Sequence, residues 1–501
     1  MAALPTAPPG APAPPTRRNT ELAMLAFACL LTIAAQSIVD LTVTGSLTVE
    51  VATFGGWFTA IWVVAHLVVR RLAPYADPLL LPATALLCGI GLVVIHRLDL
   101  AEAMEASLGG DSAPAEQAPS QLIWALVGLV LFIAVLAVIR DHRALARYAY
   151  TLMFVGLIAL AIPAVLPSSL SEVNGAKLWI LIGGFSIQPG EFAKVALICF
   201  FAAYLVDKRD VLSLASRRVM GLEFPRGRDL GPVILAWAVS LLVLIFERDL
   251  GSSLLIFGIF MVMLYIATER FSWLLIGLLM FMGGAYIAYQ AFSHVRVRVD
   301  IWLDPFAYRD DEGYQIVQSL FGFGTGGLFG TGLGGGRPAT VPFASTDFIG
   351  SAIGEELGLF GVVALVMLYL LIVERGLRTA LVVRDSFGKL LAAGLAFAVA
   401  WQVFVVLGGV TKLIPLTGLT TPFVSYGGSS LVANFALIAL LVRISDAARR
   451  PSVVITPKTD LFEASTQIVK LTPDDKADER AAERAAESVA QEPAEKAEQK
   501  T

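Results

Sequence analysis

Residues 250–268 read LGSSLLIFGIFMVMLYIAT, an uncharged stretch bounded by Asp249 and Glu269. An apolar run of about 20 residues is long enough for an α-helix to cross the hydrocarbon core of a bilayer. Eleven further runs of similar character occur, at residues 21–43, 53–69, 77–95, 121–139, 147–166, 190–206, 231–246, 272–291, 348–373, 389–409 and 424–444. The sequence therefore predicts an all-α integral membrane protein with about twelve transmembrane helices.

The composition supports a membrane protein. Of the 501 residues, 56% are hydrophobic and 16% are charged, and the mean hydropathy is +0.74. Soluble domains carry about 25% charged residues. The three cysteines fall inside apolar runs and the four histidines lack paired ligand spacing, so neither a disulfide framework nor a structural zinc site is expected.

Both ends of the chain have a different composition from the membrane domain, which we place at residues 19–450. Residues 1–18 are rich in Pro and Ala, have no cleavage site after a short apolar run, and are interpreted as a retained cytoplasmic tail. Residues 452–501 contain 11 acidic and 7 basic residues and no apolar stripe. We therefore expect residues 451–501 to form a disordered, charged cytoplasmic tail.

The distribution of Lys and Arg predicts the orientation. With the N-terminus inside, the inner loops of the first 450 residues collect 21 basic residues and the outer loops eight. Cytoplasmic loops carry the excess of positive charge, so both termini are expected in the cytoplasm. Four unusual segments then face outward, at residues 167–190, 247–251, 292–347 and 410–425.

The outer segments carry the ionisable groups of interest. Glu191 and Lys194 are three residues apart, hence on one helix face, and could pair in a cavity or form an ordinary helix start with a snorkelling lysine. Arg296 and Arg298 alternate along the long loop 292–347. They could bind a diphosphate or lie on a solvated edge. The run Asp310-Asp311-Glu312 offers a general base, or a solvated turn.

The remaining outer motifs are glycine-rich or acidic. The run Gly322–Gly336 is neither a Walker A loop nor a dinucleotide fingerprint. Glu355 and Glu356 lie inside an apolar run, where carboxylates are expensive to bury, and predict a functional or structural polar role. Non-helical backbone near membrane depth, as expected at 411–430, lines a cavity or is buried in protein. Together the four segments predict a polar site on the outer face.

Several of these motifs resemble the SEDS family (shape, elongation, division and sporulation proteins, including RodA, FtsW and SpoVE), over about residues 120–445. The motifs that carry the resemblance are FSIQPGEFAK at 185–194, DLGSS at 249–253, GYQ at 313–315 with Gln318-Ser319, TDF at 346–348, GEELG at 354–358, and TGLT at 417–420 with Pro422 and SYGGSS at 425–430. The resemblance implies a ten-helix core. The two further N-terminal helices are similar to the arrangement in actinobacterial RodA-type members, and the large extracytoplasmic loop lies between helices 9 and 10.

The resemblance also implies an activity. Its members are peptidoglycan glycosyltransferases that polymerise lipid II at the outer face of the cytoplasmic membrane, for elongation and shape or for division, beside a class B penicillin-binding protein. The implied reaction is an inverting displacement of diphospho-undecaprenol by the C4 hydroxyl of an acceptor sugar. A divalent cation (Mg²⁺ or Mn²⁺) could share the diphosphate, although no ligand spacing designates a metal site. We expect no nucleic-acid partner.

The site residues follow from these motifs, with three departures from the family pattern. Tyr308 occupies the position of the family's catalytic Asp, Ser345 stands where a His is usual, and Leu178 where an Arg is common. Asp310 and Asp311, two and three residues later, are therefore the predicted catalytic residues. The predicted substrate-binding residues are Lys177, Glu191, Lys194, Asp249, Arg296, Arg298, Asp347, Glu355 and Ser425.

Two other functions remain open from the sequence. A flippase of lipid-linked precursors would need polar residues through the full membrane depth and a weak internal repeat. The ionisable residues instead gather at the outer helix ends, and no repeat is evident. A non-catalytic activator of the penicillin-binding protein would use the same outer surface as a polymerase.

Overall fold

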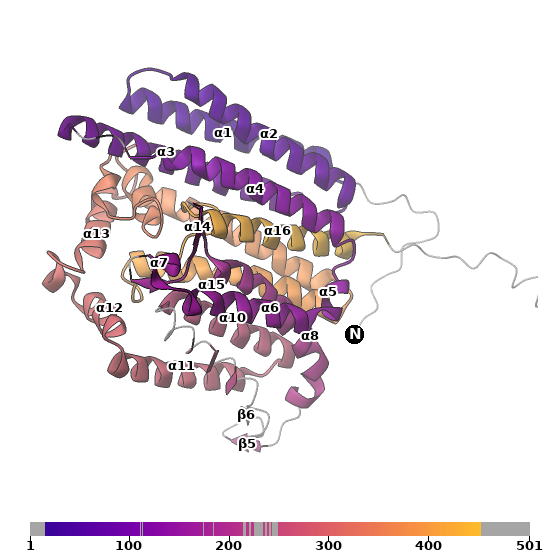
Figure 1. Cartoon of the computed structure of the whole chain (residues 1–501). Helices are drawn as coiled ribbons and strands as arrows, with labels where there is room; N and C mark the ends of the chain where they lie inside the picture. The colour runs from indigo at the N-terminus through magenta and orange to yellow at the C-terminus, as the bar shows by residue number, and fades with distance from the viewer. Residues whose placement is uncertain are drawn as a thin grey trace, which may run out of the picture. The chain divides into compact units, whose positions relative to one another are not determined.

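The computed structural model (Figure 1) describes residues 16–110, 112, 114–173, 175–183, 185–213, 217–219, 222–224, 234–235, 238–239, 242 and 249–451. Within this part, ten helices are long and apolar enough to cross a membrane. They are α1 (Arg18–Val43), α2 (Val49–Leu72), α3 (Leu80–Gly109), α4 (Gln117–Val138), α8 (Pro189–Ser213), α10 (Leu250–Thr268), α11 (Phe271–Ala291), α14 (Ile349–Val382), α15 (Ser386–Val410) and α16 (Gly428–Arg449). The chain is a multi-pass, all-helical membrane protein.

Ten of the twelve predicted runs are thus confirmed as candidate spans. The run 147–166 forms α6 (Ala149–Val165), which is apolar but only 17 residues long. The run 231–246 lies outside the described residues apart from scattered positions, as do nearly all residues of the two predicted tails.

Three helices form the centre of the bundle. The apolar windows of α3 and α16 are 83% buried and that of α15 is 78% buried, whereas those of α1, α4 and α14 are 33% buried. The outer helices therefore bury one stripe and present apolar side chains elsewhere, as expected where lipid is the solvent. In Figure 1, α1 and α2 lie along α3 and α4, on the side of the bundle opposite α11.

Small residues set the helix spacing. A side chain at Gly91 on α3 would collide with the backbone of Val424, and one at Gly376 on α14 would lie 2.7 Å from the Cβ of Ala396 on α15. Without a hydrophobic driving force between helices in lipid, such close backbone approach is a main source of packing energy.

The first of the four segments predicted to face outward contains short strands between the helices. After α7 (Ser168–Ser171), β1 (Glu172–Val173) pairs antiparallel with β2 (Ala176–Lys177), and β3 (Ile180–Ile182) with β4 (Phe185–Ile187). A third pair, β5 (Arg217–Val219) and β6 (Leu222–Phe224), follows α8. These three two-stranded hairpins are the strands of the described part of the chain.

The predicted long loop 292–347 is largely helical. It contains α12 (Ser293–Leu303), a 3-10 turn at Pro305–Tyr308, α13 (Tyr314–Gly326) and a second 3-10 turn at Pro338–Thr340. α13 packs on α14, and Ser319 Oγ donates to the carbonyl of Val410, 3.0 Å away. The short helix α5 (Ala144–Arg147) lies at the opposite end of the bundle (Figure 1).

Candidate active site

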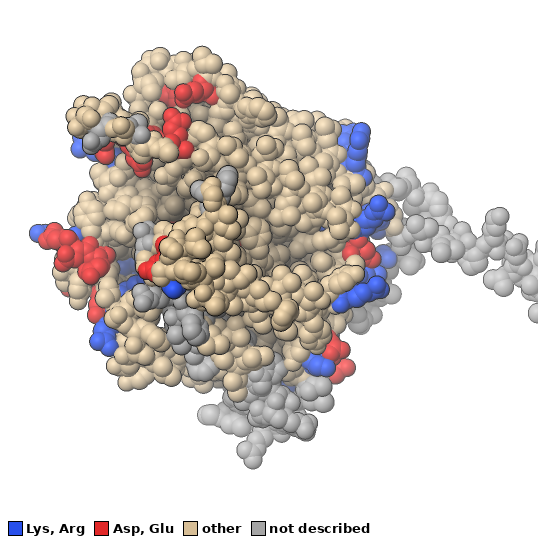
Figure 2. All heavy atoms as spheres, viewed as in Figure 1, with Lys and Arg blue, Asp and Glu red and all other residues tan. Residues whose placement is uncertain are grey.

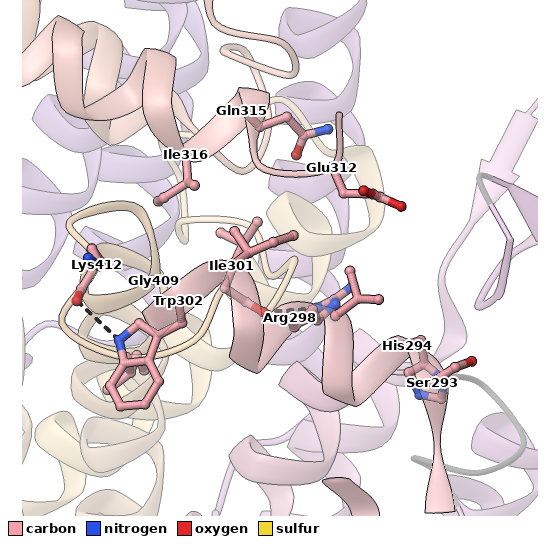
Figure 3. Close-up of a pocket in the computed structure, with 13 residues that line it drawn as sticks. Ser293, His294, Arg298, Ile301, Trp302, Glu312, Gln315, Ile316, Gly409 and Lys412 are labelled. Carbon is pink, nitrogen blue, oxygen red and sulfur yellow. Dashed lines mark hydrogen bonds between the residues drawn. The ribbon is translucent and has the colours of Figure 1, made fainter. Parts of the chain in front are cut away.

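A cavity of about 490 Å³ lies between α12, the start of α13 and the segment after α15 (Figure 3). Its polar lining includes His294, Arg298, Glu312, Gln315 and Lys412. Its apolar lining is Val297, Ile301, Trp302, Ile316, Ile414 and Leu416, completed by Ser293 and Gly409. A pocket with a few convergent polar groups on apolar walls is the usual form of a binding site.

The helical form of α12 decides which arginine faces this cavity. Successive residues turn by about 100° around a helix, so Arg296 and Arg298 point in different directions. Arg298 lines the cavity and donates to the carbonyl of Leu416 at 3.0 Å. Arg296 instead donates to the carbonyls of Tyr289 and Gln290 at the end of α11.

α12 is held against the segment after α15. Val295 is buried against Ala288 of α11, and Trp302 Nε1 donates to the carbonyl of Lys412 at 3.2 Å. An amphipathic ring with a satisfied indole N–H is well suited to a membrane–water boundary. These contacts fix one wall of the cavity.

A tight turn between residues 308 and 313 presents the carboxylate. The N–H groups of Asp311 and Gly313 both donate to the carbonyl of Tyr308, and an added Cβ at Gly313 would lie 2.7 Å from that oxygen. The turn directs Glu312 to the cavity, where Figure 3 shows it beside Gln315 and across from Arg298. Asp310 is 83% exposed beside Arg309 and does not line the cavity.

Arg298 also approaches a buried carboxylate, Asp249, and a half-buried one, Asp347. A Cβ added at Gly418, whose φ is +76°, would lie 3.7 Å from Asp347 and 3.8 Å from the Arg298 guanidinium. Asp249 caps α10 by accepting from the backbone N–H and hydroxyl of Ser252. Desolvation raises the pKa of Asp347 to about 6; Arg298 opposes the shift and Asp249 adds to it. Desolvation likewise raises the pKa of Asp249. The positive charge of Arg298 therefore partly compensates the negative charges of both Asp249 and Asp347.

The pair Glu191–Lys194 is linked to this site through hydrogen bonds. Lys194 Nζ donates to Glu191 at 2.8 Å and to Gln402 at 2.7 Å, and Gln402 Nε2 donates to the carbonyl of Thr420 at 2.9 Å. Both charged side chains are buried, so this is a paired group within the bundle. The chain of bonds connects α8 and α15 to the loop that carries Gly418.

The carboxylates of GEELG hold the glycine-rich segment in place. Glu355 accepts from the backbone N–H of Arg337 at 2.7 Å, and Glu356 accepts from Arg97 Nε of α3 at 2.9 Å. Gly358 has a φ of +66°, and a side chain there would collide with the backbone of Gly330. Of the two roles that the sequence predicts for Glu355 and Glu356, functional or structural, these bonds fit the structural one.

Ser425 connects two site segments. Its hydroxyl donates to the carbonyl of Thr346 at 2.6 Å and accepts from the N–H of Thr421 at 2.8 Å, while Tyr426 N–H donates to the carbonyl of Ser345. These bonds fix the backbone on either side of Asp347 and Gly418.

Of the predicted site residues, the structure brings together Arg298, Asp249 and Asp347. Lys177 lies on the β1–β2 hairpin, and neither it nor Asp311 lines the cavity.

Sequence reasoning did not select Glu312, Gln315, Trp302 and Lys412. Glu312 belongs to the acidic run considered above as a source of the general base, and Gln315 to the GYQ motif; these two patterns could have identified the first two. Among the described residues, no group of three His, Cys, Asp or Glu could hold a metal ion.

The arrangement combines anion binding with proton acceptance. The Arg298 guanidinium is suited to phosphate oxygens. Glu312 is exposed on the cavity wall and is free to accept a proton from a hydroxyl group bound between it and Arg298.

Comparison with known proteins places this architecture in a family. The family model described as "Cell cycle protein" (FtsW, RodA, SpoVE) matches residues 78–450. The chain is 55% identical over 458 residues to "Peptidoglycan glycosyltransferase RodA" of Mycobacterium tuberculosis (strain ATCC 25618 / H37Rv), covering 91% of this chain and 96% of the relative. It is 34% identical over 383 residues to "Probable peptidoglycan glycosyltransferase FtsW" of Geobacter sp. (strain M18), covering 76% and 99%.

A solved structure agrees with the sequence relatives. The chain superposes with a TM-score of 0.59, at 27% identity, on a structure described as "Structural coordination of polymerization and crosslinking by a peptidoglycan synthase complex". The match covers 74% of this chain and 98% of the other. The chain therefore belongs to the FtsW/RodA/SpoVE family, the SEDS proteins.

Proposed function

We propose that this chain is a peptidoglycan glycosyltransferase that polymerises lipid II into glycan strands at the outer face of the cytoplasmic membrane. One observation carries the proposal. The cavity that carries Arg298, Glu312 and Lys412 adjoins a second, apolar cavity of about 480 Å³ between α10, α11, α12 and α15, and Ile414 lines both. A cavity with charged groups next to an apolar one that opens among spanning helices fits a substrate with a sugar-diphosphate head and a long polyprenyl tail.

The charges fit the reaction. In an inverting displacement, the acceptor C4 oxygen forms a bond to the donor C1, and the bond from C1 to the diphosphate oxygen breaks. The acidic run takes the hydroxyl proton. Glu312 is the member that lines the cavity, and Asp310 and Asp311 stand behind it in the same turn. Arg298 and Lys412 offset the charge that develops on the departing diphosphate.

The other predicted residues divide into two roles. Asp249 and Asp347 position Arg298. Lys177, Glu191, Lys194, Glu355 and Ser425 support the surrounding segments, and Arg296 meets the substrate only if α12 turns. Any Mg²⁺ or Mn²⁺ would bind with the diphosphate, and the reaction as proposed requires none.

We propose that all twelve predicted runs cross the membrane, with both termini in the cytoplasm. α6 and the run 231–246 complete a core of ten helices, and α1 and α2 are additional. Figure 2 supports the orientation, because Lys and Arg side chains gather at the end of the bundle that carries α5, whereas acidic side chains are prominent at the end that carries α12.

The proposed partner is a class B penicillin-binding protein, which would crosslink the strands that this chain makes. The similar solved structure is of a complex that coordinates polymerization with crosslinking. By likeness to RodA, the proposed role is elongation and shape, with division as the alternative.

Reconstitution separates the three candidate functions. The full chain is placed in liposomes with labelled lipid II, with and without the partner, and glycan strands are resolved on gels. We expect strands in both samples and more with the partner. No strands in either sample, with the partner's transpeptidation still stimulated by this chain, would support an activator. Transfer of lipid II between leaflets without strands would support a flippase.

A further inference from the structure

α1 and α2 lie outside the residues that the family model matches, yet they help to form a membrane groove. A cavity of about 540 Å³ opens between α1, α2 and α4. Its walls are mainly apolar and include Phe54, Trp57, Ile61, Leu122 and Leu126. Trp57 is 60% exposed on this surface. The groove is separate from the candidate active site, because the two cavities share no lining residue.

The groove contains an unsatisfied polar group. Gln36 of α1 lines it and is 1% exposed, and its side-chain amide oxygen is buried without a hydrogen-bond partner. A buried amide that lacks a partner is costly, so such groups are usually satisfied by protein, water or a ligand. Nearby, His96 Nε2 is 2.8 Å from Asp40, which also accepts from the Thr48 hydroxyl. The Asp40 carboxylate thus has its hydrogen-bond partners within the protein. The amide oxygen of Gln36 has none there and can accept a hydrogen bond from a molecule bound in the groove.

The mouth of the groove is acidic. Glu50 at the start of α2 and Glu116 before α4 both line it and are exposed. None of the described residues that line the groove is Lys or Arg. In Figure 2 acidic side chains mark the ends of these helices on the same side of the molecule as α12. The mouth therefore favours a cation with N–H donors and disfavours a diphosphate.

The depth of the groove matches one leaflet. Its lining runs from Val49 to Ile61 on α2 and from Ala118 to Leu126 on α4. At 1.5 Å per residue the α2 part spans roughly 18 Å, about half of a bilayer with a hydrocarbon core of about 30 Å. A partner's transmembrane helix needs a seam along the whole span. An acyl chain of the outer leaflet needs only this half.

We propose that this groove binds a phospholipid of the outer leaflet whose headgroup carries a primary ammonium. One acyl chain lies along Trp57 and Leu122, and the ammonium donates to Glu50, to Glu116 and to the unpaired amide oxygen of Gln36.

Lipid competition on the intact protein tests the headgroup. The full chain is purified in a mild detergent and titrated with phosphatidylethanolamine, phosphatidylcholine or phosphatidylglycerol of identical acyl chains, and bound lipid is counted by native mass spectrometry. We expect affinity to fall in that order, because choline keeps the charge without N–H donors and glycerol has no cation. Equal or tighter binding of phosphatidylglycerol would overturn the proposal.

Two variants place the lipid in the groove. Thr53→Trp fills it from the exposed side of α2 and should weaken phosphatidylethanolamine binding at least tenfold. Gln36→Leu should weaken it about fivefold to tenfold, the usual worth of one hydrogen bond. Glu105→Gln, which removes an outer carboxylate of α3 that does not line the groove, is the matched control and should change nothing. Wild-type lipid binding by Thr53→Trp would exclude the groove.

Thermal unfolding gives an independent reading. In lipid-free detergent, Gln36→Leu should melt above wild type, since it removes an unpaired buried amide. Phosphatidylethanolamine should raise the wild-type melting temperature more than that of the variant. An equal rise in both proteins would contradict the role of Gln36 in the lipid site.

Discussion

Two acidic segments of this chain look alike in sequence and differ in the structure. Glu355 and Glu356 follow a glycine inside α14, and Asp310 to Glu312 precede a glycine at the start of α13. Glu355 and Glu356 are 5% and 3% exposed, and both accept hydrogen bonds from the segment around Arg337 or from α3. The run before Gly313 is exposed, and only Glu312 reaches the cavity.

The difference lies in how each carboxylate is compensated. A buried carboxylate must be paired at all times, so its bonds are part of the fold and it cannot exchange a proton without cost. A carboxylate on a cavity wall keeps water or substrate as its partner and can accept a proton during each turnover. The depth at which the backbone places a cluster of acidic residues thus decides whether the cluster stabilises the fold or can take part in proton transfer.

The largest expected effect is on activity, at Glu312. Glu312→Gln keeps the shape of the side chain and removes the base, so the rate of lipid II polymerisation should fall by about 10²–10⁴-fold. The melting temperature should stay at the wild-type value because the side chain is exposed. If Asp310→Asn or Asp311→Asn loses more activity than Glu312→Gln, the base is one of the two aspartates first predicted.

The second effect is on stability, at Glu356. Glu356→Ala leaves Arg97 as a buried charge without its carboxylate, at a cost of about 3–5 kcal/mol. The free energy of unfolding in detergent measures this loss. Removing both charges in Arg97→Met/Glu356→Met should recover most of it. A stable Glu356→Ala protein would show that the pair is not part of the scaffold.

The third effect concerns pH, at Asp347. Its pKa is raised to about 6 from an ordinary value of 3.8, so the folded protein binds this proton more tightly than the unfolded chain does. The contribution is fully present below pH 3.8 and is lost as the pH rises through 6, by an amount on the order of 3 kcal/mol. Asp347→Asn lacks the titration. The variant should therefore gain stability relative to wild type between pH 4 and pH 7, which thermal melts in a pH series will detect. Parallel curves would contradict the raised pKa.

The smallest effect is expected at Asp310. Its contact with Arg309 is exposed on both sides and such pairs contribute about 0–1 kcal/mol, so Asp310→Asn should keep activity within about threefold and unchanged stability. The activities of Asp310→Asn and Glu312→Gln should be measured side by side with one lipid II preparation. Such assays compare two acidic residues of the same turn directly.

The sequence predicted ten of the candidate spans and three of the grouped residues, because hydropathy and charge act over short stretches of chain. Arg298, Asp249 and Asp347 were selected from separate motifs, and the fold brings them together around Gly418. The choice between Arg296 and Arg298 could not be made, since it depends on α12 being a helix. The choice of Glu312 depends on the turn closed by the Tyr308 carbonyl, a backbone contact with no pattern in the side chains.

The bond between Arg97 and Glu356 has a consequence for synthesis. The two residues are separated by 259 positions, and translation at about 5–20 residues per second delivers α14 roughly 10–50 s after α3. During that interval the guanidinium has no carboxylate and must stay near the water interface or borrow another partner. The end of the bundle that carries this pair therefore closes late in biogenesis, after the helices that bear it have entered the bilayer.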